Sequence, residues 1–73
     1  MKDDVILSWL GNRIKQGRKE KKLSLGALAA DCEIDKANLS RIESGKVNIT
    51  VLTLNKIATR LFGSLQAMFG TEQ

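Results

Sequence analysis

Residues 23–46 have the sequence LSLGALAADCEIDKANLSRIESGK, and this stretch decides the fold of the chain. It holds two short segments with apolar residues at helical spacing. Ser24 and Asp35 each precede one segment, and both residue types are favoured caps of a helix N-terminus. Gly45 follows the second segment and can supply the left-handed backbone that ends a helix. We therefore expect two short helices joined by a tight turn, over about residues 24–44.

The apolar residues of this stretch predict how the two helices cross. Ala29 falls where the helices meet at a steep angle, and a larger side chain there would push them apart. Cys32 is expected to be a small buried apolar residue. The residues that would close the core beneath the turn are Leu28, Ile34, Leu39 and Ile42.

With those directions fixed, the outer face of the second helix is polar and basic. Lys36 and Arg41 can donate to guanine O6 and N7, and Ser40 can donate or accept. Ala37 can contact a thymine methyl group. A short helix with such a face fits the major groove of DNA. The alternative interpretation is a helix face that is merely solvated.

The flanking sequence predicts three more helices, so we expect one all-α, compact five-helix domain over residues 1–73. The first helix spans about residues 4–21, with Asp3 or Asp4 as its cap. The fourth lies between Thr50 and Gly63, and a short fifth helix follows Ser64. Proline is absent and hairpin turn pairs are missing, which favours helices over strands. The apolar residues at helical spacing in the first helix include Val5, Ile6, Trp9, Leu10 and Ile14.

Composition narrows the functional classes. The chain has no histidine and a single cysteine, so we expect no metal site, no cofactor and no enzyme activity. A lone cysteine fits a reducing compartment. No stretch approaches the roughly 18 apolar residues of a membrane span, and the acidic N-terminus is no secretory signal. The expected location is the cytoplasm, in association with the nucleoid.

The charge of the chain is positive and unevenly placed. The formal net charge is +4, and residues 12–22 hold six basic residues and one acidic residue. A basic segment on a nearly neutral body favours a polyanion as partner, here double-stranded DNA. The alternative is a solvated helix end whose lysines complement the helix dipole.

Three pieces of the sequence carry a family resemblance: LGNRIKQGRKEKKLS (10–24), LAADCEIDKANLSRIESGK (28–46) and TLNKIATRLFGSLQAMF (53–69). They resemble the helix-turn-helix domain of lambda-repressor-like transcriptional regulators, also called the Cro/repressor or xenobiotic-response-element family. The stretch NITVLTLNKIA (48–58) is most similar to the restriction–modification controller proteins of that family. The resemblance implies a DNA-binding regulator whose second motif helix reads DNA.

The resemblance also implies roles for individual residues. The implied base contacts are Lys36, Ala37, Ser40 and Arg41. Arg18 and Glu43 match positions that form a structural ion pair in several relatives. The expected phosphate contacts are Arg13, Lys15, Lys19, Ser24, Asn38, Ser44, Lys46 and Asn48.

The chain departs from the family pattern at three positions. Leu25 replaces the usual glutamine, which removes a side-chain contact to phosphate. Glu33 replaces the usual turn glycine, so either the turn rearranges or a left-handed backbone there costs about 1 kcal/mol or more. Phe62 replaces a common glycine after the fourth helix and adds a large apolar group.

Apolar residues near the C-terminus predict either a two-fold dimer interface or a cap on the core. The expected interface residues are Phe62, Leu65, Met68 and Phe69. A homodimer would place two recognition helices about 34 Å apart and would require a palindromic operator. The expected function is therefore a transcriptional regulator that binds palindromic DNA as a homodimer. The alternative is an antitoxin-like module in which Leu25 and the C-terminal apolar residues contact a partner protein, and a toxin or a polymerase is a possible partner.

Overall fold

The computed structural model describes residues 3–70, and this part of the chain forms five α-helices and no strand. The all-α expectation is confirmed, and every predicted helix is present within one or two residues of its expected bounds. The helices are α1 (Asp3–Glu20), α2 (Leu25–Cys32), α3 (Lys36–Glu43), α4 (Val51–Phe62) and α5 (Leu65–Phe69).

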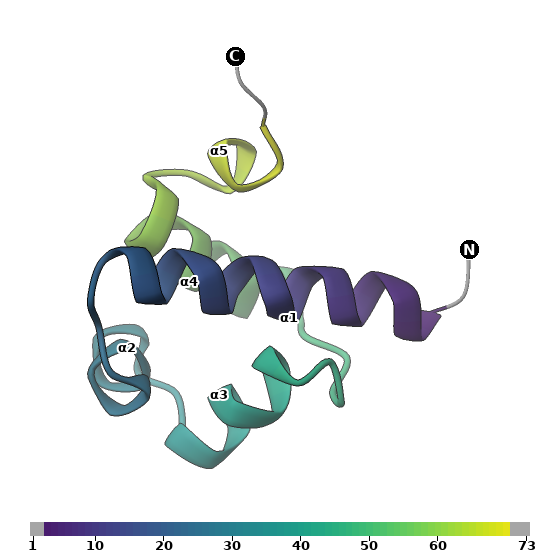
Figure 1. Ribbon diagram of the computed structural model, residues 1–73, viewed down its shortest axis with the longest axis horizontal. Coiled ribbons are helices and arrows are strands. Elements are labelled where there is room, and N and C mark those ends of the chain that lie inside the picture. The colour runs from purple at the N-terminus through teal and green to yellow at the C-terminus, as the bar shows by residue number, and fades with distance from the viewer. Residues whose placement is uncertain (1–2, 71–73) are drawn as a thin grey trace.

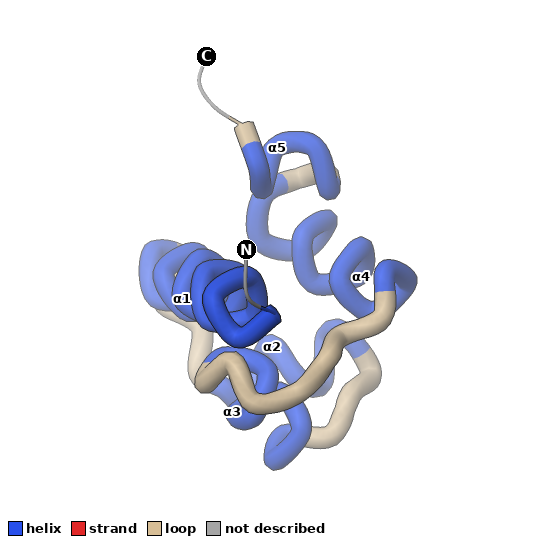
Figure 2. Tube along the Cα trace, turned by 90° about the vertical axis from the view of Figure 1, so that its right-hand side faces the viewer, coloured by secondary structure: helices blue, strands red, loops and turns tan. Residues whose placement is uncertain are grey.

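Helix α1 crosses the whole molecule and separates two groups of elements. Helices α2 and α3 lie on one side of α1, and α5 lies on the other (Figure 1). Viewed along α1, helix α4 runs beside it, with α3 below the pair and α5 above (Figure 2). The two helices of the central motif therefore lie opposite the C-terminal helix.

Side-chain caps determine where four of the helices begin. Each capping residue has extended backbone, and its side-chain oxygen accepts a hydrogen bond from the backbone N–H three residues later. Asp3 and Asp4 do not cap α1 but lie in its first turn, where carboxylates complement the helix dipole. The capping residues are Ser24, Asp35, Thr50 and Ser64.

The turn between α2 and α3 keeps its left-handed residue without a glycine. Glu33 has φ = 58° and ψ = 42°. The next backbone N–H, of Ile34, donates to the Ala29 carbonyl at 2.9 Å, which closes a Schellman motif. The sequence left two outcomes open for Glu33, and the structure has the left-handed turn rather than a rearranged one.

The ends of α1 and α3 use the same motif. Gly45 ends α3 with φ = 73°, as its position predicts. Lys22 follows α1 with φ = 58°, although lysine gives no sequence signal for that conformation. The N–H of Leu23 then donates to the Arg18 carbonyl at 3.1 Å. Sharp helix ends at these positions allow α1, α2 and α3 to fold onto one another through short connections.

The core lies where α1 to α5 converge. The N-terminal end of α1 extends past α2 and α3 (Figure 1). Val5, Ile6 and Trp9, in the N-terminal half of α1, are exposed despite their helical spacing. Ile34 is partly buried against the core, as expected for a residue beneath the turn. The buried residues are Ile14, Leu28, Ala29, Cys32, Leu39, Ile42, Leu54, Ile57, Ala58, Leu61 and Met68.

We expect Glu33→Gly to raise the free energy of unfolding by about 1 kcal/mol, because glycine adopts the left-handed conformation without the steric cost of a Cβ. Urea denaturation measures the change. Ala30→Gly, at an exposed helical position of α2, is the control and should lose about 1 kcal/mol. An unchanged or lower stability of Glu33→Gly would contradict the strain assigned to this turn.

Candidate nucleic-acid interface

The C-terminal end of α3 rests directly on the backbone of α1. A Cβ added at Gly11 would lie 2.5 Å from the carbonyl oxygens of both Ile42 and Glu43. A Cβ added at Gly45 would lie 2.9 Å from the Cα of Ser8. Since backbone atoms cannot move aside cheaply, a larger residue at either glycine would separate α3 from α1. These two contacts fix how far α3 stands from the body of the domain.

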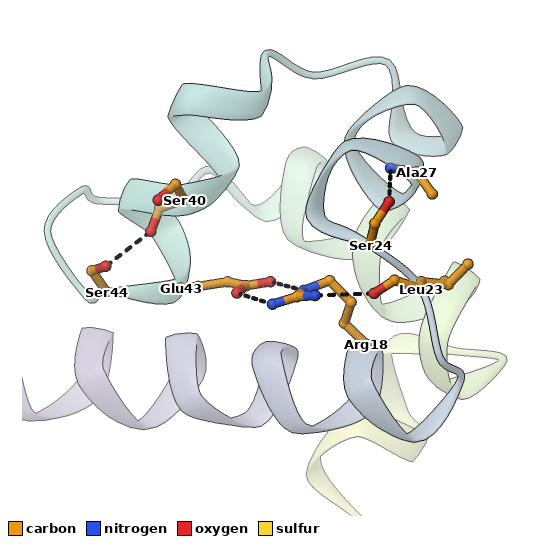
Figure 3. Close-up of polar contacts among 7 residues, drawn as sticks. All are labelled: Arg18, Leu23, Ser24, Ala27, Ser40, Glu43 and Ser44. Carbon is orange, nitrogen blue, oxygen red and sulfur yellow. Dashed lines mark hydrogen bonds and ion pairs between the residues drawn. The ribbon is translucent and has the colours of Figure 1, made fainter.

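An ion pair fixes the orientation of α3 on α1 (Figure 3). Arg18 donates from Nε to Glu43 Oε2 at 2.7 Å and from Nη2 to Oε1 at 3.0 Å. Its remaining amino group donates to the Leu23 carbonyl at 3.0 Å. The two side chains are only 13% and 6% exposed, so water screens this bidentate pair weakly. One guanidinium thus joins α1, the start of the turn before α2, and α3.

The hydrogen bonds that Arg18 donates to Glu43 raise the pKa of Arg18, burial lowers it, and the negative charge of Glu43 raises it further, so the net shift is upward. The guanidinium therefore stays charged at any pH at which the protein folds. The resemblance implied this structural pair, and the structure contains it.

Helix α3 is anchored by one face and free on the other. Leu39 and Ile42 are buried in the core. Positions 36, 37, 40 and 41 are exposed and share the opposite side of the helix, because residues four apart lie one turn above each other. The structure therefore brings the four expected base-reading residues together on an accessible surface, and their contact with DNA stays a prediction. These residues are Lys36, Ala37, Ser40 and Arg41.

The long side chain of Lys36 extends towards α2. Its Cδ lies 3.9 Å from the place a Cβ would occupy at Gly26, which is an ordinary van der Waals distance. Leu25, which replaces the family's usual glutamine, packs against the core. The ammonium group of Lys36 is thus the cation that α3 presents on the side of α2.

Five of the eight expected phosphate contacts occupy exposed positions at the start of α2, on α3 and in the loop after it, and their contact with DNA stays a prediction. Ser24 caps α2, where its Oγ accepts from the Ala27 N–H at 3.0 Å. Ser44 Oγ donates to the Ser40 carbonyl at 3.0 Å (Figure 3). The other three, on α3 and in the loop that follows it, are Asn38, Lys46 and Asn48.

Two lysines of α1 extend the basic border. Lys15 and Lys19 are exposed and follow Gly11 at steps of four residues. Since Gly11 faces α3, both lysines lie on the part of α1 that turns towards the motif. Their contact with phosphate stays a prediction.

Arg13 was expected to contact phosphate, but its side chain makes contacts within the domain. Its Nε donates to the Met68 carbonyl at 2.8 Å, and its guanidinium carbon lies 4.7 Å from the centre of the Phe62 ring. Met68 belongs to α5, which lies on the side of α1 away from α3 (Figure 1), and Phe62 is the last residue of α4, which runs beside α1. We therefore leave Arg13 out of the DNA interface.

The expected dimer surface needs a similar correction. Met68 is fully buried in the core of the single chain and cannot be offered to a partner. Phe62 and Leu65 are half-buried and pack against that core. Only Phe69 is exposed, and its ring stacks on Trp9 with centroids 5.7 Å apart. Helical spacing alone placed Trp9 on the apolar face of α1, and no local pattern indicates that it lies at this surface.

Phe62, which replaces a glycine common in the family, packs over Gly17 of α1. A Cβ at Gly17 would lie 2.6 Å from Cζ of Phe62, so the ring fills the space above that glycine. The large side chain therefore covers α1 instead of adding to a free surface. The sequence signal for this contact is Gly17, because a glycine inside a helix often marks a place where another group packs closely.

Cys32 is buried, and burial raises the pKa of its thiol, with a further increase from the charge of Asp31. A neutral, enclosed thiol is unreactive, in agreement with the expected packing role. Within residues 3–70 no cluster of side chains could hold a metal ion. The same residues include no helix long and apolar enough to cross a bilayer.

The fold and its exposed second motif helix define a helix-turn-helix domain. The family model HTH_3, described as helix-turn-helix, matches residues 14–67. That range is more than half of the chain, and the chain therefore belongs to this lambda-repressor-like family.

Two relatives share 40% sequence identity with the chain. One is the control protein C.MunI of a Mycoplasma species, aligned over 60 residues that cover 81% of each chain. The other is the crystal structure of an HTH_3 family transcriptional regulator from Vibrio cholerae, with a TM-score of 0.84. That match covers 93% of this chain and 38% of the longer Vibrio chain. The similarity extends over the whole motif and its supporting helices.

We expect Arg18→Met to lower the free energy of unfolding by about 3 kcal/mol, because it leaves the Glu43 carboxylate enclosed without its partner. Glu43→Leu should have a similar effect, because it leaves the enclosed Arg18 guanidinium without its carboxylate partner. The double variant should lose clearly less than the sum of the two, since no charge is stranded. Denaturant unfolding of all four proteins gives the coupling energy. Strictly additive losses would contradict the role of the pair.

Proposed function

We propose that this chain, a helix-turn-helix DNA-binding regulator, controls transcription by binding palindromic operators as a homodimer. The observation that carries the proposal is the position of α3. Leu39 and Ile42 fix one side of the helix in the core, and the opposite side presents Lys36 and Arg41 to solvent. The HTH_3 match and the two named regulators support the same assignment. Because DNA is its expected partner, we place its action in the cytoplasm, in association with the nucleoid.

Base recognition would come from a few side chains of α3. Arg41 can donate two hydrogen bonds to O6 and N7 of one guanine, and Lys36 can bind a second guanine. Ala37 is small enough to let the backbone approach a thymine methyl group. We therefore expect guanine at the half-site positions opposite Lys36 and Arg41.

Affinity would come mainly from phosphate contacts. Lys15, Lys19 and Lys46 are exposed cations that border α3, and Ser24 lies with free backbone N–H groups at the start of α2. Each neutralised phosphate releases counterions, so operator affinity should fall steeply as salt rises. Leu25 contributes no polar group to this contact because it packs against the core.

A dimer solves the problem that one short helix reads too few bases for specific binding at cellular salt. Trp9 and Phe69 form an exposed aromatic pair on the side of the molecule away from α3. A second copy bound there would leave both recognition helices free. Two-fold symmetry of the protein would then require two-fold symmetry of the operator.

The structure does not support one of the two surfaces that the antitoxin-like alternative requires. It required Leu25 and the C-terminal apolar residues as a partner surface, but Leu25 is partly buried against the core. A partner protein, whether toxin or polymerase, would therefore have to bind elsewhere.

Selection of bound sequences from a random DNA pool tests the function directly. We expect enrichment of a palindrome whose half-site centres lie about 10–10.5 base pairs apart or a multiple of that spacing. A pool that stays random after several rounds would refute sequence-specific binding. Enrichment of single, unpaired half-sites would refute the dimer but would still support sequence-specific recognition of DNA by α3.

We expect Arg41→Ala to reduce discrimination between the operator and a site altered at one guanine by about 1–3 kcal/mol. Competition binding against the two DNAs measures the change. Lys46→Ala, a loop cation, is the control and should weaken both complexes equally while lowering the salt slope by about 1. Unchanged sequence preference in Arg41→Ala would remove Arg41 from the base-reading set.

We expect Phe69→Asp to be monomeric, because a charge within the aromatic pair would have to be desolvated when a second copy binds. Sedimentation equilibrium gives the assembly state. Gln66→Asp introduces the same charge at another exposed position of α5 and should leave the dimer intact. A Phe69→Asp variant that sediments like the parent would reject this surface.

A further inference from the structure

Different elements hold the two ends of α3. At the N-terminal end, the backbone N–H of Ile34 donates at 2.9 Å to the carbonyl of Ala29 in α2. The C-terminal end lies on α1 (Figure 3), where the carbonyls of Ile42 and Glu43 face Gly11. Because the two ends are held separately, a change at the contact with α1 would tilt α3 rather than move the whole helix.

The contact at the C-terminal end is made by backbone on backbone. A Cβ added at Gly11 would lie 2.5 Å from the Ile42 and Glu43 carbonyl oxygens, so those carbonyls would have to retreat by about 0.5 Å or more. The Ile42 carbonyl also accepts from the Gly45 N–H at 3.0 Å, so the end of α3 would move with it. Gly45 in turn lies against Ser8, which is one helical turn before Gly11 on α1.

The ion pair between Arg18 and Glu43 does not set this distance. Both side chains have several rotatable bonds, so they can follow a shift of about 0.5 Å and keep their hydrogen bonds. A backbone carbonyl that meets a Cβ has no such freedom. The ion pair therefore fixes the direction of α3, whereas Gly11 fixes the distance of its C-terminal end from α1.

The end of α3 that depends on Gly11 carries Arg41, and the end tied to α2 carries Lys36. The helix rises about 1.5 Å per residue, so the two positions lie roughly 7.5 Å apart along its axis. A tilt about the N-terminal end would displace Arg41 more than Lys36. Since a binding side chain must be held within about 0.5 Å of its working geometry, the Arg41 contact would be lost first.

We propose that Gly11 is a positioning residue for base recognition, which sets how deeply the Arg41 end of α3 enters the DNA groove. This inference rests on the proposed function as a sequence-specific reader of DNA. Gly11 is buried and acts only through the backbone of α3. Specificity is therefore set partly by α1, and by different elements for the two ends of α3.

Gly11→Ala tests this role one base pair at a time. The DNA is the sequence that the parent selects from a random pool, together with copies changed at single base pairs. Arg41→Ala and Lys36→Ala identify the base pair that each side chain reads. We expect Gly11→Ala to reduce discrimination at the Arg41 base pair about tenfold, within the range of one bidentate contact, and to keep the Lys36 base pair within about twofold of the parent.

Gly17→Ala is the matched control. Gly17 is also buried on α1, but a Cβ there would meet the side chain of Phe62 and no part of α3. This variant should keep discrimination at both base pairs, and urea denaturation shows that each variant is folded. If Gly11→Ala does not fold, Gly45→Ala decides by the same criterion, because its Cβ would press on the backbone of Ser8 from the other side of the contact.

Two kinds of failure can be told apart. Equal losses at both base pairs, or no loss at either, would overturn the positioning role of Gly11. So would an Arg41→Ala variant with the sequence preference of the parent, because no base contact would then remain for Gly11 to position. A parent protein that selects no sequence from the pool would instead refute the proposed function itself.

Discussion

The bidentate contact between Arg18 and Glu43 is the interaction on which the arrangement of this domain depends. Helix α3 has eight residues, too few to be stable alone, so its direction must be imposed from outside. The ion pair imposes it at one point, and Gly11 sets the distance to α1 at another. With the inner face of α3 held in this way, the direction of its outer face follows. The same guanidinium also reaches the Leu23 carbonyl, so the turn into α2 is fixed by one side chain as well.

Helix α1 therefore serves as a scaffold with two working sides. Residues facing α3 are small or ion-paired, which permits close approach and rigid orientation. On the other side, Trp9 stacks on Phe69 of α5, and Arg13 donates to the Met68 carbonyl of α5. Gly17 leaves space for the Phe62 ring at the end of α4. The division also separates charge from apolar surface: the exposed cations of α1 border the motif, and the exposed aromatic rings lie on the other side. In the proposed function, DNA and a second copy of the chain would bind on opposite sides of one helix.

The sequence predicted much of this fold because its helix ends carry local signals. Ser24, Asp35 and Thr50 cap as expected, and Gly45 takes the left-handed conformation that local chemistry requires. Other features depend on tertiary structure that no local pattern contains. Lys22 and Glu33 adopt left-handed backbone because the neighbouring helices demand the turn. Arg13 donates to a carbonyl 55 residues away, and no local pattern predicts such a distant contact. Its positive charge was therefore interpreted as a phosphate contact. Helical spacing placed Trp9 on the apolar face of α1, but it does not tell where that helix extends beyond its neighbours. The apolar residues near the C-terminus were compatible with a dimer interface or a cap on the core, and Met68 is buried in the core.

The central claim is that the outer face of α3 is the surface that enters DNA. Amide chemical-shift mapping by NMR, with the selected operator added to the labelled protein, tests it most directly. The account predicts that the largest changes fall on the residues around Lys36, Ala37, Ser40 and Arg41, with smaller ones at the start of α2 and in the loop after α3. Changes confined to α5 and the N-terminal half of α1, with α3 unaffected, would contradict it.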